Sequence, residues 1–504
     1  MPSLIGVDVG TQGTKGLLVT QDGRQLAAAF RASDLRRLAP GVVEEDPERQ
    51  FATVCEVIQE CLSASGVDAR SVTGIAIAGQ MAGVIGIGED GRNVTPYDSW
   101  LDTRCAPYIA HMDTIAGEAV TRNAGCPPSF NHGPKILWWK AERPEVFHTI
   151  RSFVQPGGYA AMRLCGLSAA DAFIDHTYLH FSGFADNARG QWDTALCDQF
   201  GLDPALLPRI VEPHHVVGGV SPTAAERCRL KPGTPVVAGC GDTAASFLAC
   251  GATGEGICVD VAGTASVFAA TTSSYRPDLT QKMLACGRSA TPGLWHSYAY
   301  INGGGMNLEW FRQEIANRGR AEVGGLGLEA LEEIANEALS DDAPIFVPHL
   351  EGRVCPSEPG LRGGWLGITR ATSFGALYRA VLESVALEYA LYQRGILALY
   401  PHLRFRELRI TGGGEKSALW NQMKADVLGM PAAQVRGGSG APLGAAMLAC
   451  FGVNLCTDLP TAAQQWIALG HQLTPNGDLT AHYQARLRLY EAALEAARRL
   501  AGLI

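Results

Sequence analysis

Two short passages of this chain repeat one pattern, about half the chain apart. Residues 7–14 read VDVGTQGT and residues 259–266 read VDVAGTAS. In each, an apolar run typical of a β-strand breaks at a Gly-Thr turn and then resumes. Glycine lets the backbone approach an anion, and freed amides and threonine hydroxyls can donate to it. The pattern fits two phosphate-holding hairpins on two related domains with a nucleotide between them, and it equally fits two ordinary hairpins.

Length and charge limit the class of protein. At 504 residues the chain is too long for a single core, so two large domains are expected. The net charge of −9 argues against nucleic acid or an anionic membrane as the main partner. An acidic protein can still bind a polyphosphate, because local amides and Mg²⁺ set the field at the site.

Cysteine usage and apolar runs indicate a cytoplasmic protein. The fourteen cysteines are scattered singly and form no CxxC pair, which predicts reduced thiols and no zinc ribbon. The chain enters a strand at once, without a basic and apolar leader. The longest apolar stretch, 72–88, is interrupted by Thr73, Gln80 and five glycines, so no membrane span is expected.

The order of elements at the N-terminus is informative. Apolar runs and an Asp-Gly turn predict an antiparallel meander over 4–9, 16–20 and 25–30. Asp46 is typical of a helix N-cap, and a strand is predicted at 74–78 after that helix. This β-β-β-α-β order differs from a βαβ dinucleotide domain.

Further along, the pattern predicts two more strands and four helices. The strands are expected at 236–238 and 408–411, and the helices at 243–249, 326–338, 374–399 and 480–500. We place a domain boundary near residue 249, which gives an N-terminal domain 1–248 with the first phosphate loop and a C-terminal domain 249–504 with the second. The GxGxxG match at 86–91 lacks the helix that a dinucleotide fingerprint must open, and Asp-Gly within it predicts a hairpin.

The first hairpin carries groups suited to phosphate and metal. Asp8 leaves the strand just before Gly10-Thr11, and Lys15 follows four residues after Thr11. A carboxylate there can hold Mg²⁺ through water, while Thr11 and Lys15 meet phosphate oxygens. A turn-capping aspartate and a solvated lysine are the alternative interpretation.

Three other clusters are candidates for chemistry. Asp242 follows Gly239-Cys240-Gly241 at a helix start, as either an N-cap or a general base that the glycines keep reachable. Trp100, Asp102 and Arg104 form a polar and aromatic loop that suits a sugar, or else a salt bridge beside a tryptophan. Glycines 412–414 end a strand, where a flat ring or a phosphate can approach the backbone.

Together these pieces resemble the FGGY carbohydrate kinase family. The matching blocks occur in the family's order and cover nearly the whole chain: 7–15 (VDVGTQGTK), 74–81 (GIAIAGQM), 100–104 (WLDTR), 134–139 (PKILWW), 239–245 (GCGDTAA), 263–266 (GTAS), 363–369 (GGWLGIT), 376–383 (ALYRAVLE), 410–417 (ITGGGEKS), 420–426 (WNQMKAD) and 440–446 (GAPLGAA). The resemblance is greatest to members that phosphorylate D-xylulose.

The resemblance implies an α/β fold of two actin-like (ribonuclease H-like) domains around an active-site cleft that closes on ATP and sugar. It implies Asp242 as the catalytic base and Asp8 beside Mg²⁺. The nucleotide would be held by Asp8, Thr11, Lys15, Gly263, Thr264, Gly412, Gly413, Gly414 and Asn421. The sugar would be surrounded by Met81, Ala82, Trp100, Asp102, Arg104 and Thr243.

The chain also departs from the D-xylulose pattern. Such members typically have His after the Gln-Met pair, Asn before the loop aspartate and Asn after the base, where this chain has Ala82, Leu101 and Thr243. His132 occupies a small hydroxyl position, and Ala376 replaces a polar residue. The Arg-Glu pair of a glycerol kinase is absent, since Met81-Ala82 stand there. Losing a bond to a substrate hydroxyl can shift preference by orders of magnitude.

The resemblance therefore implies an ATP-dependent kinase acting on a primary hydroxyl of a ketopentose, with D-xylulose as the leading candidate and xylose metabolism as its setting. Another sugar or polyol, such as ribulose or a pentitol, is the first alternative. A non-catalytic actin-like nucleotide-binding regulator and an actin- or chaperone-type ATPase are the others. A homodimer is a further expectation, because dimers are common among proteins of this kind.

Overall fold

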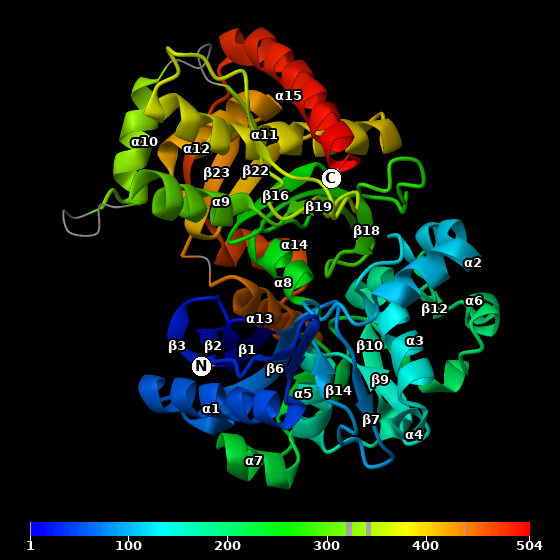
Figure 1. Ribbon diagram of the computed structural model, residues 1–504. Coiled ribbons are helices and arrows are strands. Elements are labelled where there is room, and N and C mark those ends of the chain that lie inside the picture. The colour runs from blue at the N-terminus through cyan, green and yellow to red at the C-terminus, as the bar shows by residue number, and fades with distance from the viewer. Residues whose placement is uncertain (1, 319–324, 339–343, 438, 504) are drawn as a thin grey trace.

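The computed structural model describes residues 2–318, 325–338, 344–437 and 439–503 and has two lobes, each built on a mixed β-sheet (Figure 1). The N-terminal lobe holds a six-stranded sheet in the order β14-β15-β6-β1-β2-β3. These strands are β1 (Ser3–Gly10), β2 (Gly13–Thr20), β3 (Gln25–Ala32), β6 (Val72–Gly79), β14 (Val216–Gly219) and β15 (Pro235–Val237).

The C-terminal lobe repeats this topology. Its seven-stranded sheet runs β18-β19-β17-β16-β22-β23-β24. The strands are β16 (Ile257–Ala262), β17 (Ser266–Thr272), β18 (Ala285–Arg288), β19 (Trp295–Ile301), β22 (Glu407–Thr411), β23 (Ala432–Arg436) and β24 (Ala468–Leu473). In both lobes three antiparallel strands lead into two parallel ones, so β1 corresponds to β16 and β2 to β17. The two repeated sequence passages thus form equivalent hairpins in two actin-like domains.

The first sheet is buried on both faces because its strands are apolar at successive positions. Ile5, Val7 and Leu18 pack with helix α1 (Pro47–Ser65) and helix α5 (Pro156–Cys165). Leu4 and Leu17 point to the other face. The predicted helix start is confirmed, since the Asp46 side chain accepts from the backbone N–H of Glu48 at 2.9 Å.

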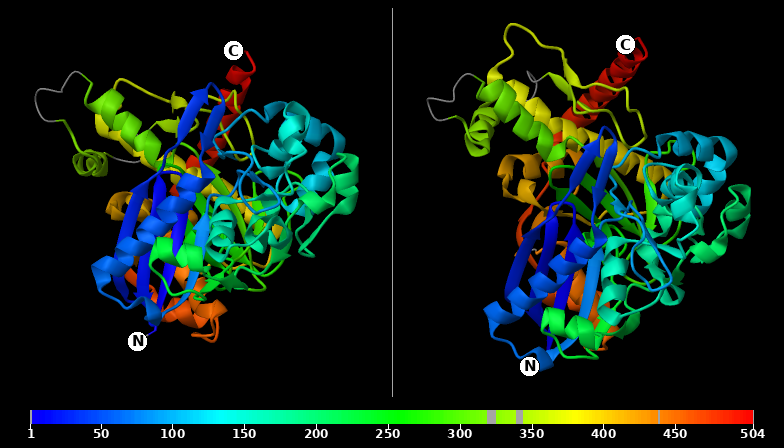
Figure 2. Two further views of the ribbon diagram at one scale, coloured as in Figure 1. Left: turned by 90° about the horizontal axis from the view of Figure 1, so that it is seen from below. Right: turned by 60° about the horizontal axis from the view of Figure 1, so that its bottom comes forward.

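Two helices, α8 (Asp242–Ala249) and α13 (Ala441–Gly452), lie between the sheets (Figure 1). α13 covers the β1 face opposite α1. Figure 2, seen from below, shows α1 in front of the N-terminal sheet. It approaches closely because a Cβ on Gly6 would lie 1.9 Å from the carbonyl oxygen of Pro442. α13 thus covers the N-terminal sheet although it comes from late in the chain, and the predicted division at residues 248 and 249 stays a prediction.

A second contact joins the lobes at β18. The backbone N–H of Cys286 donates to the carbonyl of Gly125 at 2.8 Å, just past α2 (Ala106–Ala124). The Arg288 Nε donates to the carbonyl of Asn187 at 2.9 Å. The lobes are therefore held together both at the α8–α13 layer and along β18.

The remaining helices mostly follow the predicted pattern. α11 (Phe374–Leu399) spans the predicted range, while α10 (Leu328–Glu337) and α15 (Thr480–Ala501) differ from it by one or two residues. The N-terminal lobe also contains β4 (Arg36–Ala39), β5 (Val42–Glu45), β7 (Ile85–Ile87), β8 (Tyr97–Asp98), α3 (His132–Glu142) and η3 (His176–Phe181). The C-terminal lobe also contains α9 (Gly304–Trp310), η7 (Gly413–Lys416) and α12 (Ala418–Leu428). The GxGxxG match forms a turn after β7, as predicted, with the Gly91 N–H donating to the Gly88 carbonyl.

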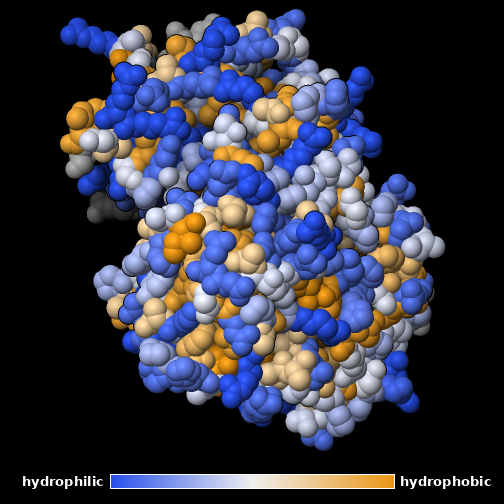
Figure 3. All heavy atoms as spheres, turned by 90° about the vertical axis from the view of Figure 1, so that its right-hand side faces the viewer, coloured by the Kyte–Doolittle hydropathy of each residue, from blue (hydrophilic) through white to orange (hydrophobic). Residues whose placement is uncertain are grey.

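The described residues include no helix that is both long and apolar enough to cross a bilayer. Figure 3 shows the side of the molecule that lies on the right in Figure 1. Hydrophilic and hydrophobic residues are interspersed there over both lobes.

Candidate active site

A cavity of about 640 Å³ lies between the lobes. That volume is within the usual range for small-molecule sites. It brings together the first hairpin, the start of α8, the flanks of the second hairpin and the glycine-rich end of β22. Its lining comprises Asp8, Lys15, Asp242, Thr243, Ser246, Val261, Val267, Thr411, Gly412, Gly413, Glu415, Lys416, Ser439, Gly440 and Ala441.

The first hairpin presents a carboxylate and an ammonium on one face. Asp8 on β1 lies opposite Lys15 on β2 in the antiparallel register, so both side chains project the same way. Asp8 is only 6% exposed, while Lys15 is exposed. Asp8 Oδ1 is buried and has no hydrogen-bond partner among the described residues. A buried carboxylate oxygen without a donor fits a cation.

The loop before α8 places Asp242 at the cavity. Gly239 has φ +76°, and a Cβ there would lie 1.9 Å from the Ile77 carbonyl, so the loop requires glycine. The Gly241 N–H donates to Thr177 Oγ1 at 2.9 Å. The Tyr178 hydroxyl lies between this loop and the end of β6, 3.4 Å from the Cys240 carbonyl and 3.0 Å from the Gly79 carbonyl.

Asp242 is itself held by the next residue. The Thr243 N–H and hydroxyl both donate to Asp242 Oδ1, at 2.6 and 3.2 Å. These two bonds orient the Asp242 carboxylate at the start of α8, and both are accepted by Oδ1 rather than Oδ2.

The two acidic residues influence each other. Burial raises the pKa of Asp8 to about 8, with the nearby Asp242 carboxylate adding to the rise and Lys15 opposing it. Burial raises the pKa of Asp242 to about 6, while the bonds from Thr243 and the charge of Lys15 oppose the rise. Burial therefore makes both carboxylates easier to protonate than a free aspartate, while the bonds from Thr243 favour the ionised form of Asp242.

The second hairpin meets the cavity through its flanks, Val261 and Val267, while the turn packs on α9. The Gly263 N–H donates to the Ala265 carbonyl at 3.0 Å, and the Gly263 carbonyl accepts from Gly305 at 3.1 Å. Thr264 is exposed. The structure places Gly263 and Thr264 at the end of the hairpin, outside the lining of this cavity.

The aspartate of the second hairpin has a different environment. Asp260 occupies the position equivalent to Asp8 but is fully buried. It pairs with Lys424 Nζ at 2.5 Å and accepts from the Tyr389 hydroxyl at 2.6 Å. The repeat is thus retained in topology but not in chemistry.

The glycine-rich strand end lies on the opposite side of the cavity from the first hairpin. Gly412 has φ +90°, and a Cβ would meet the Ala262 carbonyl at 2.8 Å, whereas a Cβ on Gly413 would meet nothing within 4 Å. A Cβ on Gly414 would lie 2.6 Å from that of Ala262. The fully buried Asn421 donates from Nδ2 to the Glu415 carbonyl at 2.8 Å, so it supports this loop from behind.

The predicted sugar loop is tightly held. Asp102 is buried and accepts from the Val43 N–H at 2.8 Å and from Arg104 Nε at 3.0 Å. Arg104 also pairs with Glu44 at 2.8 Å. Trp100 is 40% exposed, which leaves much of its ring accessible. Asp102 and Arg104 thus bond chiefly to each other and to β5.

Met81 reaches the site through a smaller cavity that shares Thr243 with the large one. Its carbonyl lies 2.5 Å from His132 Nε2. Burial lowers the pKa of His132 to about 4, so the neutral ring donates there. Ala82 is half-buried beside it. His132 therefore fixes the backbone at Met81 from within the lobe.

Sequence reasoning missed several residues of the site. Lys416 and Ser246 line the cavity, and Gln80 bonds to Thr11. Gln80 and Lys416 lie inside motifs described above and Ser246 lies one helical turn after Asp242, so the sequence carries a signal for each. Thr177 and Tyr178 had none, because their contact with the Asp242 loop joins segments far apart in sequence.

The chain matches two family models. Residues 3–249 match the N-terminal domain of the FGGY family of carbohydrate kinases, and residues 258–453 match its C-terminal domain.

Curated relatives and solved structures span nearly the whole chain. A xylulose kinase of Bacillus subtilis is 27% identical over 97% of this chain and 96% of its own, and an autoinducer-2 kinase of Klebsiella pneumoniae is 25% identical over 97% and 93%. A ligand-bound xylulose kinase of Lactobacillus acidophilus superposes with a TM-score of 0.90, 23% identity and 98% coverage of both chains. A gluconate kinase of the same organism gives 0.91, 23% and 99% of both. The structural similarity, at these identities, establishes the fold.

Proposed function

The chain belongs to the FGGY family of carbohydrate kinases, and on that premise we propose that it transfers the γ-phosphoryl group of ATP to a primary hydroxyl of a ketopentose, with D-xylulose as the first candidate. Members of this family are sugar kinases that use ATP, generally with a divalent metal. The observation that carries the proposal is the shared cavity in which Asp242 lies with Asp8, Lys15 and the Gly412-Gly413 strand end.

Asp242 is the proposed catalytic base. Burial raises its pKa above that of a free aspartate, which makes the carboxylate a better acceptor for the proton of a hydroxyl whose oxygen attacks phosphorus. The bond from the sugar oxygen to the γ-phosphorus forms while the bond to the ADP oxygen breaks, and the hydroxyl proton ends on Asp242. Thr243 keeps the carboxylate in place by donating to Oδ1.

Asp8 is the proposed anchor for Mg²⁺. Its unpartnered Oδ1 fits a cation or a water bound to one. No cluster of three metal-ligating side chains occurs among the described residues, as suits a metal held mainly by phosphate oxygens. When bound, Mg²⁺ would neutralise developing charge on the phosphates. Lys15 would add a positive charge on the same face.

The nucleotide is proposed to lie along the glycine-rich strand end. Gly412 and Gly413 line the cavity, and the open space over Gly413 leaves room for a ligand against the backbone. Gly263, Thr264, Gly414 and Asn421 are predicted to bind the nucleotide, and we propose that they do so by shaping the loops around it. Closure of the lobes would exclude water, which would otherwise compete with the sugar for ATP.

The choice of sugar is the open part of this proposal. Ala82 and Thr243 stand where members acting on D-xylulose typically carry longer hydrogen-bonding side chains, and Leu101 replaces a third. These changes favour a second candidate, a kinase of another sugar or polyol such as ribulose or a pentitol. The spread of relatives, from xylulose kinase to autoinducer-2 kinase, agrees with a family that varies its acceptor.

The test is ADP release with Mg-ATP across D-xylulose, L-xylulose, D- and L-ribulose, ribitol, xylitol, arabinitol and glycerol. Strong stimulation by D-xylulose supports the first candidate, and stimulation by another member supports the second. ADP release that no acceptor increases would contradict both and favour an ATPase or a regulator. A cytoplasmic location and a homodimer stay predictions, for which fractionation and light scattering are the measurements.

A further inference from the structure

The hydroxyl of Thr11 is engaged by two side chains that do not line the cavity in which Asp8 and Lys15 lie. Thr11 Oγ1 donates to Gln80 Oε1 at 3.2 Å and accepts from Trp100 Nε1 at 2.8 Å. A threonine hydroxyl has one proton to donate. While Thr11 donates that proton to Gln80 Oε1, its side chain has no hydrogen to donate to a phosphate oxygen.

The orientation of the Gln80 amide is fixed by a third residue. Gln80 Nε2 donates to Glu45 Oε1 at 2.9 Å, so the amide oxygen must face Thr11. Gln80 and Glu45 are 1% and 3% exposed. Turning the amide would leave buried polar atoms unpaired, which is costly. The chain Glu45–Gln80–Thr11–Trp100 therefore has one favoured direction.

Strand β5 connects this chain to the rest of the predicted sugar loop. Its consecutive residues Val43, Glu44 and Glu45 bond, respectively, to Asp102 at 2.8 Å, to Arg104 at 2.8 Å and to Gln80 at 2.9 Å. One short strand thus sets the spacing between loop 99–104 and the first hairpin.

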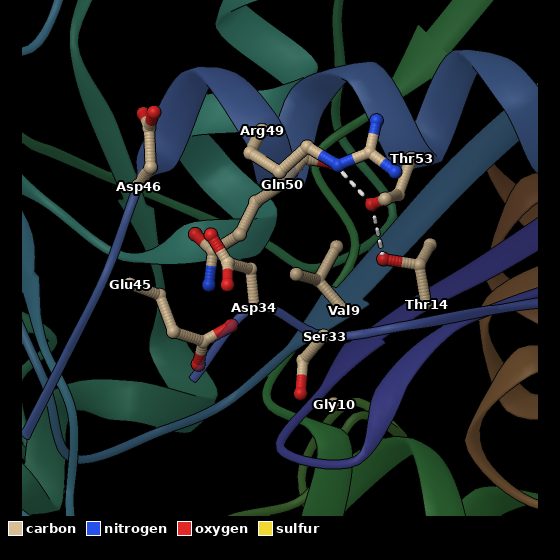
Figure 4. Close-up of a pocket in the computed structure, with 10 residues that line it drawn as sticks. All are labelled: Val9, Gly10, Thr14, Ser33, Asp34, Glu45, Asp46, Arg49, Gln50 and Thr53. Atoms are coloured by element: carbon tan, nitrogen blue, oxygen red, sulfur yellow. Dashed lines mark hydrogen bonds between the residues drawn. The ribbon is translucent and has the colours of Figure 1, made fainter. Parts of the chain in front are cut away.

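There is little space behind the hairpin for Glu45 to shift. Figure 4 shows Glu45, Gln50 and Gly10 among the residues around a pocket whose volume is about 10 Å³. A cavity of that size holds about one water molecule. The buried contact between Thr14 and Thr53 at 2.6 Å closes one side of it.

We propose that Thr11, Gln80 and Glu45 are positioning residues for the indole of Trp100. The Thr11 hydroxyl then serves the acceptor side of the site, and the hairpin backbone with Lys15 serves the phosphate side. Trp100 keeps an accessible ring for the apolar face of a sugar or polyol. This inference rests on the proposed function, because it assigns a role within the same acceptor site.

Steady-state kinetics with the best acceptor of the panel separate the two sides. Thr11→Val keeps the shape and removes the hydroxyl. We expect KM for the acceptor to rise about three- to tenfold, with KM for ATP within about twofold. Thr11→Ser restores the hydroxyl and should recover acceptor KM to within about threefold of wild type. The matched control is Thr14→Val, whose hydroxyl bonds to Thr53, and its acceptor KM should stay within about twofold of wild type.

A rise in KM for ATP with unchanged acceptor KM in Thr11→Val would overturn the proposal, because it would assign the hydroxyl to phosphate.

A second measurement does not depend on enzyme activity. The contribution of Trp100 to fluorescence, isolated by subtracting a Trp100→Phe spectrum, should become more accessible to acrylamide in Thr11→Val and Gln80→Leu. An unchanged Trp100 contribution in both variants would also overturn the proposal. If wild type phosphorylates no acceptor, the proposed function fails, while the fluorescence comparison still decides the positioning role.

Discussion

Asp8 lines the cavity between the lobes, whereas Asp260, its equivalent in the second hairpin, is fully buried against Lys424. The two residues occupy the same place in the same topology. A lysine on α12 and the Tyr389 hydroxyl satisfy the second aspartate, and the first has an oxygen without a partner. The two equivalent aspartates therefore differ in role. Asp8 is available to a ligand in the cavity, and Asp260 is part of a buried ion pair.

This contrast predicts opposite outcomes for one substitution. Asp260→Asn leaves the buried Lys424 charge unpaired, which should cost about 3–5 kcal/mol of stability. Asp8→Asn removes a carboxylate that burial already disfavours, so the melting temperature should stay the same or rise. Thermal melts of both variants, together with turnover, are the measurements. Asp8→Asn should lose turnover while remaining folded, and a lower melting temperature for Asp8→Asn than for Asp260→Asn would contradict the assignment.

Replacing the proposed base should separate chemistry from binding. Asp242→Ala removes the proton acceptor, and general-base contributions are typically about 10²–10⁴-fold. We expect turnover to fall within or beyond that range while Mg-ATP still binds. Calorimetric titration of nucleotide and coupled ADP release check the two parts. Turnover within about tenfold of wild type would show that Asp242 is not the base.

Local sequence patterns predicted much of the fold because they reflect local chemistry. Gly-Thr breaks between apolar runs define both hairpins, and Asp46 defines the start of α1. The structure also brings Asp8, Asp242 and Gly412 to one cavity, as the sequence interpretation required.

What the sequence left out depends on contacts between distant segments. The close approach of α13 to β1 requires a glycine at Gly6, and its close approach to Ala245 of α8 requires a glycine at Gly444. Neither glycine has a local signature that names its partner. The hydroxyl of Thr11 was expected on phosphate, and its actual partners, Gln80 and Trp100, are set by how β6 and the sugar loop meet the hairpin. The buried pairing of Asp260 likewise depends on the position of Lys424 on α12.

Buried His132 predicts acid sensitivity. Its pKa in the folded protein is about 4, below the ordinary value of 6.5, so the unfolded chain binds more protons between those values. Stability therefore rises with pH across that window and is lost on acidification, by up to about 3 kcal/mol from this residue.

Denaturant unfolding at pH 7 and pH 4.5 tests this in wild type and His132→Asn. The variant should be less stable at pH 7, because the bond to the Met81 carbonyl is altered, but should lose less stability on acidification. The comparison cancels the other titrating groups, such as Asp175, whose pKa burial raises to about 7 and whose effect has the opposite sign. Equal pH dependence in both proteins would rule out a buried neutral His132.

The β18 contact between the lobes predicts a strong effect from a single methyl group. Gly125 has φ +113°, and a Cβ there would lie 2.3 Å from the Cys286 carbonyl oxygen, in the backbone pair that joins the lobes. Gly66, at the end of α1, also has a positive φ, +67°, but open space around it. Gly66→Ala should therefore cost about 1 kcal/mol of stability from backbone strain alone, and Gly125→Ala at least about twice that.

The urea midpoints of the two variants compare their stabilities. ADP release shows whether the lobes still approach correctly, because only Gly125→Ala displaces β18 and with it the two halves of the cleft. Equal midpoints and equal turnover in the two variants would mean that β18 can shift freely, so that the α8–α13 layer alone fixes the relative position of the lobes.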